Sequence, residues 1–197
     1  MLQILRKVTA VNRIHTSITV SRQFYSSSDF RRNSPSPHDY LRKITDTDKN
    51  ISKQRIKTAL ELFKQKGFIN TDAVTSLLGL CNSKLSNATV ADRHALIDNI
   101  WSTSNDLGVR MNTSTYNAYL QAILNNALPC DHNVVLQSMS AADVEPDGNT
   151  YILLVDLFCK KGDVDKALKL IEYMKGKDME LSKDIFHSLL YAYSKEK

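Results

Sequence analysis

The sequence repeats itself at a spacing of 35 residues. The tripeptide Thr-Tyr-Asn at 115–117 recurs as Thr-Tyr-Ile at 150–152 and, more loosely, as Ile-Phe-His at 185–187. The segments that precede these tripeptides recur as well, beginning at Val109, Val144 and Met179. A fixed period of this length is typical of arrays in which small supersecondary units stack, because no single unit can bury its own apolar face.

One period holds two amphipathic helices. Apolar residues mark one face of the first helix at the spacing i, i+3, i+4 and i+7: Tyr151, Leu154, Val155 and Phe158. Gly162 tolerates the left-handed conformation that ends a helix, and Asp163 is expected to cap the helix that follows. Two such helices and a short loop complete one unit.

We therefore expect an all-α fold, an α-solenoid of stacked antiparallel helix pairs. The expected solenoid covers residues 51–197, with units at about 51–70 (partial), 71–112, 113–147, 148–182 and 183–197 (truncated). The second unit exceeds the period, and its extra residues are expected in the turn at 83–89. The last unit has an apolar stripe of Phe186, Leu189, Leu190 and Tyr193 but no second helix, which predicts that the chain is a portion of a longer array.

The N-terminus carries the whole of the net charge. Residues 1–32 hold six basic residues and one acid, whereas the other 165 residues hold 20 of each sign. Residues 1–30 are rich in Arg and Ser, and Ile4, Val8 and Val11 share one helical face, which predicts a disordered mitochondrial targeting segment that is removed on import. A disordered basic tail is the alternative. Residues 31–50 are expected to be a polar linker that cannot fold alone.

Composition excludes several other classes. No run of 18 apolar residues exists, so no membrane insertion is expected. Cys81, Cys130 and Cys159 form no CxxC pair, and we expect buried free thiols rather than metal ligands. The sequence has no deaminase signature, acidic metal cluster or phosphate-binding glycine loop, so neither catalytic residues nor a cofactor are predicted.

Residues 144–175 resemble a pentatricopeptide repeat. The matching features are the Thr-Tyr opening at 150, the Cys-Lys-Lys-Gly-Asp turn at 159–163, the second helix at 167–174 and the period. Three further segments, at 100–108, 116–120 and 174–178, resemble the N-terminal region of a long, leucine-rich member of the family from animal mitochondria.

The resemblance implies a function in the mitochondrial matrix. It implies binding of single-stranded mitochondrial mRNA and control of its stability and polyadenylation. It also implies a small RNA-recognition-motif partner, the stem-loop-interacting RNA-binding protein. First helices of the family line an RNA-binding face, and each unit reads one base through its fifth and last residues.

The family pattern, carried over, gives two base-reading pairs. Asn117 and Asp147 form the pair of the unit at 113, with an implied preference for uracil. Thr75 and Asn112 form a purine-reading pair in the longer unit at 71. The alternative is that these are ordinary surface polar residues, with Asp147 only capping the next helix.

The next unit departs from the pattern. Its reading positions are Ile152 and Ser182, and isoleucine cannot hydrogen-bond a base, so no reading is expected there. Four lysines between 160 and 169 could follow a phosphate backbone, but a neutral body favours solvated helix faces. A protein-binding helical-repeat scaffold without direct base reading therefore stays open as the alternative function, although scaffolds of the tetratricopeptide type have a period of about 34.

Overall fold

The computed structural model describes residues 36–47, 51–81, 85–86 and 88–195. The predicted targeting segment and the first part of the predicted linker lie outside these residues. Among the described helices, none combines the length and the hydropathy that a membrane crossing requires.

The first described helix lies where a linker was expected. Residues Pro37–Thr47 form α2, which corrects the prediction of a polar linker over 31–50. Leu41 and Ile44 of α2 are 5% and 1% exposed, and the His38 ring packs edge-on against Phe63 at 5.0 Å. Burying one aliphatic side chain contributes about 1.5–3 kcal/mol, so two such residues suffice to order a short helix against helices that are already present.

The predicted helix pairs follow along the chain. The first helices are α2, α4 (Thr71–Leu80), α6 (Thr113–Asn125), α8 (Gly148–Lys161) and α10 (Lys183–Lys195). The second helices are α3 (Lys53–Lys66), α5 (Val90–Asp106), α7 (His132–Ala141) and α9 (Val164–Gly176). The all-α solenoid of stacked helix pairs is confirmed, and α2 supplies the first helix of the unit that had been expected to be partial.

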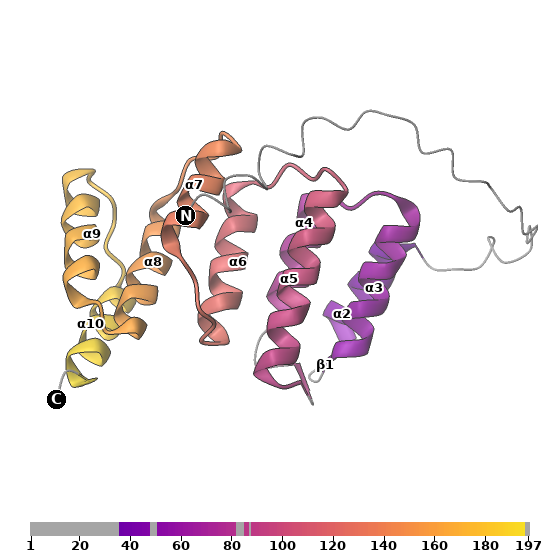
Figure 1. The fold of residues 1–197 in the computed structure, drawn as a ribbon, viewed down its shortest axis with the longest axis horizontal. Helices are drawn as coiled ribbons and strands as arrows, with labels where there is room; N and C mark the ends of the chain where they lie inside the picture. The colour runs from indigo at the N-terminus through magenta and orange to yellow at the C-terminus, as the bar shows by residue number, and fades with distance from the viewer. Residues whose placement is uncertain (1–35, 48–50, 82–84, 87, 196–197) are drawn as a thin grey trace, which may run out of the picture. The chain divides into compact units, whose positions relative to one another are not determined.

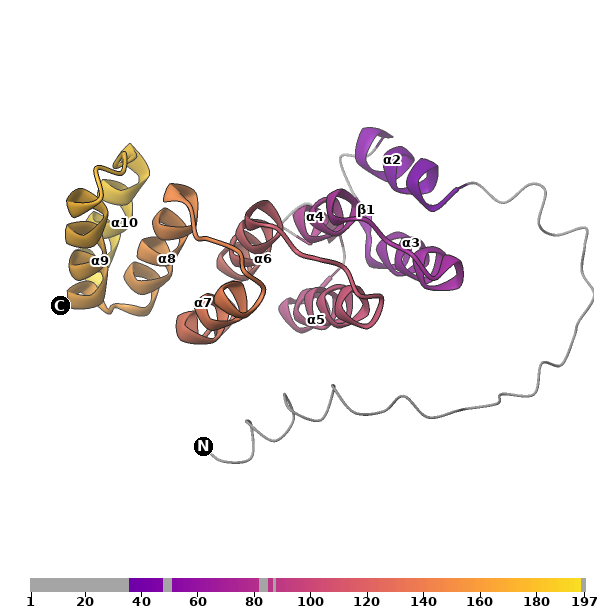
Figure 2. The same ribbon diagram turned by 90° about the horizontal axis from the view of Figure 1, so that it is seen from above.

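Successive first helices form a continuous layer. Helix α4 packs on α6, α6 on α8, and α8 on α10 (Figure 1). Figure 2 shows α4 and α6 in one layer, with α5 and α7 beside them in the other. Consecutive units therefore meet mainly through their first helices.

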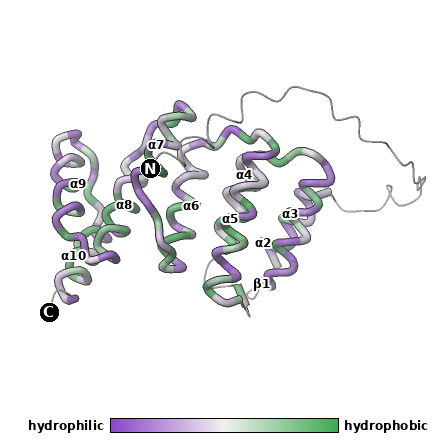
Figure 3. The backbone as a smooth tube through the Cα atoms, viewed as in Figure 1, coloured by the Kyte–Doolittle hydropathy of each residue, from purple (hydrophilic) through white to green (hydrophobic). Residues whose placement is uncertain are grey.

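The buried residues follow this layer. One apolar cluster runs from Leu41 to Leu157, and a second runs from Val155 to Ala192. Hydrophobic and hydrophilic stretches alternate along the helices (Figure 3), as expected when only one face of each helix is buried. The three cysteines are buried free thiols, as predicted, and burial raises the pKa of Cys81 to about 12.

The longer unit contains an element that the sequence did not predict. Ile51–Ser52 (β1) and Leu85–Ser86 (β2) form a short parallel pair, with Ile51 opposite Leu85. Both side chains are 3% exposed, so Leu85 packs against the start of the preceding unit's second helix.

Two details of the last units differ from expectation. Asp163 occupies the N-cap position of α9, but its side chain makes no capping hydrogen bond and pairs with Lys166 instead. In α10 the buried residues are Ile185 and Ala192, whereas Phe186 is 57% exposed. The buried face of α10 is therefore offset by one residue from the apolar stripe that the sequence predicted.

Candidate nucleic-acid interface

A side-chain cap precedes four of the five described first helices, α10 being the exception. Backbone N–H groups three positions further on donate to the side chains of Asn70, Asn112 and Asp147, at 3.0, 2.9 and 2.7 Å. Ser36 accepts in the same way before α2, at 3.1 Å. The last residues of the units at 71 and 113, Asn112 and Asp147, are thus helix caps, and the capping role considered for Asp147 is confirmed.

Asn117 reaches this cap from the preceding unit. Its Nδ2 donates to Asp147 Oδ1 at 3.0 Å, and its Oδ1 accepts from the hydroxyl of Thr150 at 2.7 Å. The same hydroxyl lies 2.8 Å from Asp147 Oδ1 and accepts from the backbone N–H of Asp147 at 3.2 Å. We call Asn117, Asp147 and Thr150 the Asn117 junction, because they join α6 to α8.

The carboxylate of Asp147 and the hydroxyl of Thr150 both favour the observed orientation of the Asn117 amide. With the amide reversed, Asn117 Oδ1 would face Asp147 Oδ1, and two acceptors would repel each other without a shared proton. The observed orientation leaves one Nδ2 hydrogen of Asn117 available. Asp147 Oδ2 accepts no hydrogen bond from the described residues, so the junction retains one donor and one acceptor.

The Asp147 carboxyl is held ionised. Burial raises its pKa, but hydrogen bonds from Asn117 and from the backbone and hydroxyl of Thr150 outweigh this effect, and the net shift is downward. Asp147 is exposed, whereas Asn117 is 7% exposed and Thr150 is fully buried. A ligand therefore meets the carboxylate directly and the amide only at its edge.

A second junction of the same design joins α4 to α6. Thr75 Oγ1 lies 3.0 Å from Thr115 Oγ1, and the Thr115 hydroxyl donates to Asn112 Oδ1, also at 3.0 Å. We call Thr75, Asn112 and Thr115 the Thr75 junction. Counting from the start of α4 therefore brings the two predicted residues, Thr75 and Asn112, to one place despite the greater length of this unit.

The two outer junctions are apolar. The residues equivalent to Asn117 and Thr150 are Leu41 and Ala73 between α2 and α4, and Ile152 and Ile185 between α8 and α10. Ser182 completes the last set, and its Oγ is buried without a hydrogen-bond partner. At the positions of Asn117 and Thr150, hydrogen-bonding side chains thus occur only in the two central junctions, whereas the outer sets have a polar side chain at the cap position alone.

Sequence reasoning missed Thr115 and Thr150. Both were visible as the first residue of the repeated Thr-Tyr pair, but a recurring threonine does not reveal that its hydroxyl spans two units. The contacts join residues 33 to 40 positions apart, which the local pattern does not encode.

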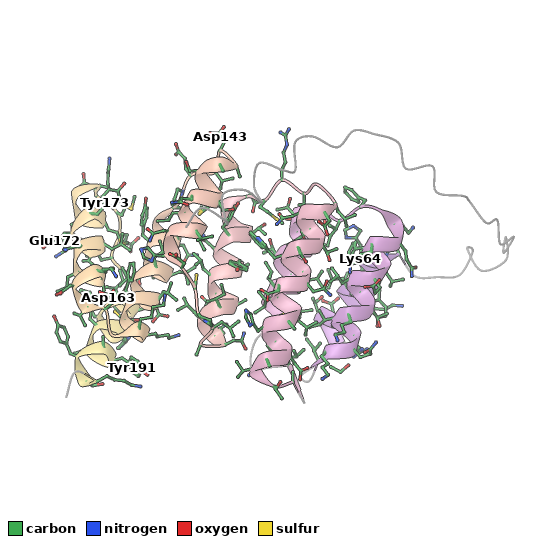
Figure 4. The ribbon with its side chains drawn as sticks, in the orientation of Figure 1. Lys64, Asp143, Asp163, Glu172, Tyr173 and Tyr191 are labelled. Carbon is green, nitrogen blue, oxygen red and sulfur yellow. The ribbon has the colours of Figure 1, made fainter. Side chains whose placement is uncertain are left out.

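Charge is unevenly distributed over the units. Residues 113–147 contain no Lys or Arg and four acids. Residues 51–70, by contrast, contain five basic residues and one acid. Lys64 of α3 is one of these basic residues, whereas Asp143 lies just beyond the end of α7 (Figure 4). The unit that holds Asn117 therefore offers no cation of its own to a phosphate.

Lysines occupy one repeated position near the C-terminal ends of α8 and α10. Asn125, Lys160 and Lys195 recur at the 35-residue period on α6, α8 and α10. Lys160 donates to the carbonyl oxygen of Leu124 at 3.3 Å and pairs with Asp156 at 3.4 Å. Among the described residues, no group of three or more His, Cys, Asp or Glu side chains is placed to hold a metal ion.

Comparison with known proteins agrees with this architecture. The sequence model of the PPR repeat family matches residues 142–175, which span the cap Asp147, α8 and nearly all of α9. These residues form a pentatricopeptide repeat. The resemblance predicted from the sequence is confirmed, and the fold class follows from stacking repeats of this kind.

Several relatives carry the same type of repeat. Over 119 residues, 60% of this chain, the sequence is 30% identical to the Xenopus tropicalis protein named "Leucine-rich PPR motif-containing protein, mitochondrial". The mouse protein of the same name is 29% identical over 68% of this chain. An Arabidopsis thaliana protein named "Small ribosomal subunit protein mL103 (rPPR7)" is 25% identical over 68% of it. The chain spans only 9% and 10% of the two leucine-rich relatives.

Proposed function

We propose that the two central junctions bind neighbouring bases of a single-stranded RNA. The observation that carries this proposal is the pairing of Asn117 and Asp147, because it presents one hydrogen-bond donor beside one ionised acceptor between two first helices. The Thr75 junction offers the Asn112 amide and a hydroxyl in the equivalent position. The RNA recognition typical of helical repeats, one base per unit, supports this arrangement.

The Asn117 junction matches uracil. The Asn117 amide N–H can donate to the O2 carbonyl of the base, while Asp147 Oδ2 accepts from N3–H. Cytosine has an acceptor at N3 and would face the carboxylate with no proton between them, which leaves both groups unpaired. At the Thr75 junction, the Asn112 amide and the Thr75 hydroxyl suit the adjacent acceptor and amino group of a purine.

Electrostatics predict weak and salt-tolerant binding. The unit that holds Asn117 has no Lys or Arg, so few counterions are released when it binds RNA. Lys160 and Lys195 lie near the other ends of α8 and α10, and Lys160 already pairs with Asp156. We expect a shallow dependence of affinity on salt concentration.

The relatives support a mitochondrial setting. Two are named as mitochondrial, and the basic N-terminal sequence favours import. We propose that this chain acts in the mitochondrial matrix on mRNA stability and post-transcriptional expression as a non-catalytic protein, with a small RNA-recognition-motif protein as partner. Crosslinking of the imported protein to RNA, with identification of the bound transcripts and the crosslinked peptides, tests this setting.

The direct test of base reading is Asp147→Asn. Asparagine caps a helix as well as aspartate, so the fold is kept, but its outward amide donates where the carboxylate accepted. We expect the preference between uracil and cytosine at one nucleotide to change by roughly tenfold in favour of cytosine. Asn117→Ala should lower the preference for uracil, whereas Lys169→Ala on α9 is the control. If all three variants lose the same affinity for every oligonucleotide, the proposal that these residues read bases is refuted.

A protein-binding scaffold is the second candidate. The acidic unit at 113–147 favours it, since four acids without a cation disfavour a polyanion. Crosslinking that recovers proteins but no RNA would select this function.

A further inference from the structure

We propose that Thr150 is a specificity-positioning residue: together with Asp147, its hydroxyl holds the Asn117 amide with one N–H toward the base, and Thr115 orients the Asn112 amide of the Thr75 junction in the same way. This inference rests on the proposed function and adds a third residue to each reading pair. The residue concerned stands third in the following unit, so it belongs to the neighbour of the unit whose base it controls.

The position of the Thr150 proton follows from the acceptors around it. The hydroxyl lies 2.7 Å from Asn117 Oδ1 and 2.8 Å from Asp147 Oδ1, but it has one proton to donate. Asp147 Oδ1 already accepts from the backbone of Thr150 and from Asn117 Nδ2, at 2.7 and 3.0 Å. Asn117 Oδ1 has no other donor among the described residues and is buried, so the proton stabilises the junction most when it is given to Asn117.

The capping box holds the hydroxyl in place. Thr150 Oγ1 accepts from the backbone N–H of Asp147, which ties its side chain to the start of α8. Thr150 is 0% exposed, so water does not compete for its proton. The amide oxygen of Asn117 is therefore drawn inward, and its N–H is left at the edge that a base can reach.

The Thr75 junction repeats the arrangement with one change. The Thr115 hydroxyl donates to Asn112 Oδ1, so the lone pairs of Thr115 face Thr75. The Asn112 amide nitrogen consequently points away from Thr115. At the outer junctions the equivalent residues are Ala73 and Ile185, which have no hydroxyl. We therefore expect no base preference at those two junctions.

The test is Thr150→Val on the full chain, with RNA affinity measured on oligonucleotides that differ at single nucleotides. Valine keeps the shape but removes the hydroxyl, so the preference for uracil should fall roughly three- to tenfold at one nucleotide and stay unchanged at the others. Thr150→Ser should restore it. Thr115→Val should change the base preference only at the adjacent nucleotide. If Thr150→Val fails to fold, Thr115→Val tests the same role at the Thr75 junction.

Two controls separate positioning from stability. Thr103→Val makes the same change at a residue of α5 that is 4% exposed and hydrogen-bonded to Asn99, and it should leave all preferences unchanged. Side-chain amide NMR signals of Asn117 should shift in free Thr150→Val and return in Thr150→Ser.

The outcomes distinguish the two proposals. A wild-type chain without any base preference would defeat the proposed function and this inference together. A wild-type preference for uracil that survives Thr150→Val, or a uniform loss on every oligonucleotide, overturns the role of Thr150 alone.

Discussion

Asn126, just beyond α6, donates a hydrogen bond of 2.7 Å to the carbonyl oxygen of Cys81 at the end of α4. Its amide also donates to Ala122 and accepts from the Nε–H of Arg93 on α5. Asn126 is 4% exposed, so one buried side chain satisfies groups from three helices of two units. Carbonyl groups at helix ends have no partner within their own helix, which is why this contact matters for stability.

Asn126→Ala should therefore lower the free energy of unfolding by about 1–3 kcal/mol, since it leaves a buried carbonyl and a guanidinium short of partners. The matched control is Asn125→Ala, because Asn125 is exposed and bonds only Gln121, and its effect should stay within about 0.5 kcal/mol. Chemical denaturation measures both. Equal effects of the two variants would show that the contacts of Asn126 contribute nothing.

The second prediction concerns the left-handed residues in the turns between units. Gly108, Asp143 and Asp178 end successive second helices with positive φ values of 69°, 56° and 52°. A Cβ at Gly108 would meet no atom within 4 Å, so its penalty is the backbone conformation alone. Gly108→Ala should lower stability by about 1 kcal/mol. Asp143→Gly should raise the stability slightly. Midpoints of thermal unfolding that shift in the same direction in both variants would refute this account.

Among the residues that precede the described first helices, Ser182 is the one whose side chain makes no capping hydrogen bond. Its Oγ is buried without a partner, whereas Asn70, Asn112 and Asp147 cap their helices. Ser182→Asn extends the acceptor toward the backbone N–H groups of α10 and should stabilise the protein by about 0.5–1 kcal/mol. Urea denaturation tests this, and a loss of stability would mean that the site has no room for the amide.

Periodicity encodes what lies within a unit better than what joins two units. The 35-residue step, the buried face of α8 and the αL glycine at 162 are local features, and each was predicted. Helix α2 was missed because only Leu41 and Ile44 mark it, and their burial depends on helices further along the chain. Thr150 and Asn126 were missed for the same reason, since hydrogen bonds across 30 or more residues leave no signal in a single amphipathic pattern.

Asp92 should contribute to the loss of folding stability at acidic pH. Its pKa is lowered to about 2 by hydrogen bonds from Lys53 first and then from Thr89. A carboxyl whose folded pKa is depressed stabilises the protein above its unfolded pKa, and this stabilisation is lost as pH falls through the folded value. The expected window lies between the ordinary value of 3.8 and about 2.

Asp92→Asn keeps a capping acceptor but cannot titrate, so it should flatten the loss of stability in that window. The Asp92 pKa followed by NMR in the wild type and in Lys53→Met gives an independent check, because the loss of Lys53 should raise it. A profile that is unchanged by Asp92→Asn would show that other carboxyls govern the acid limb.

The outer face of α10 supplies the last prediction. Phe186, Leu190 and Tyr193 are 57%, 68% and 48% exposed and follow one another at i, i+4 and i+7. Their counterparts 35 residues earlier lie on the face of α8 that packs against α9. An apolar stripe of this kind is complementary to another amphipathic helix, so the protein should self-associate as its concentration rises.

Leu190→Glu with Tyr193→Glu should keep the protein monomeric, because desolvating two carboxylates opposes the contact. The matched control is Tyr173→Glu, which changes an aromatic residue of similar exposure, 45%, on the neighbouring helix α9 (Figure 4). Sedimentation velocity over a wide range of concentrations distinguishes the variants. Association that persists in the double variant but disappears in Tyr173→Glu would move the contact from α10 to α9, where Tyr173 already packs against Tyr151 at 5.4 Å.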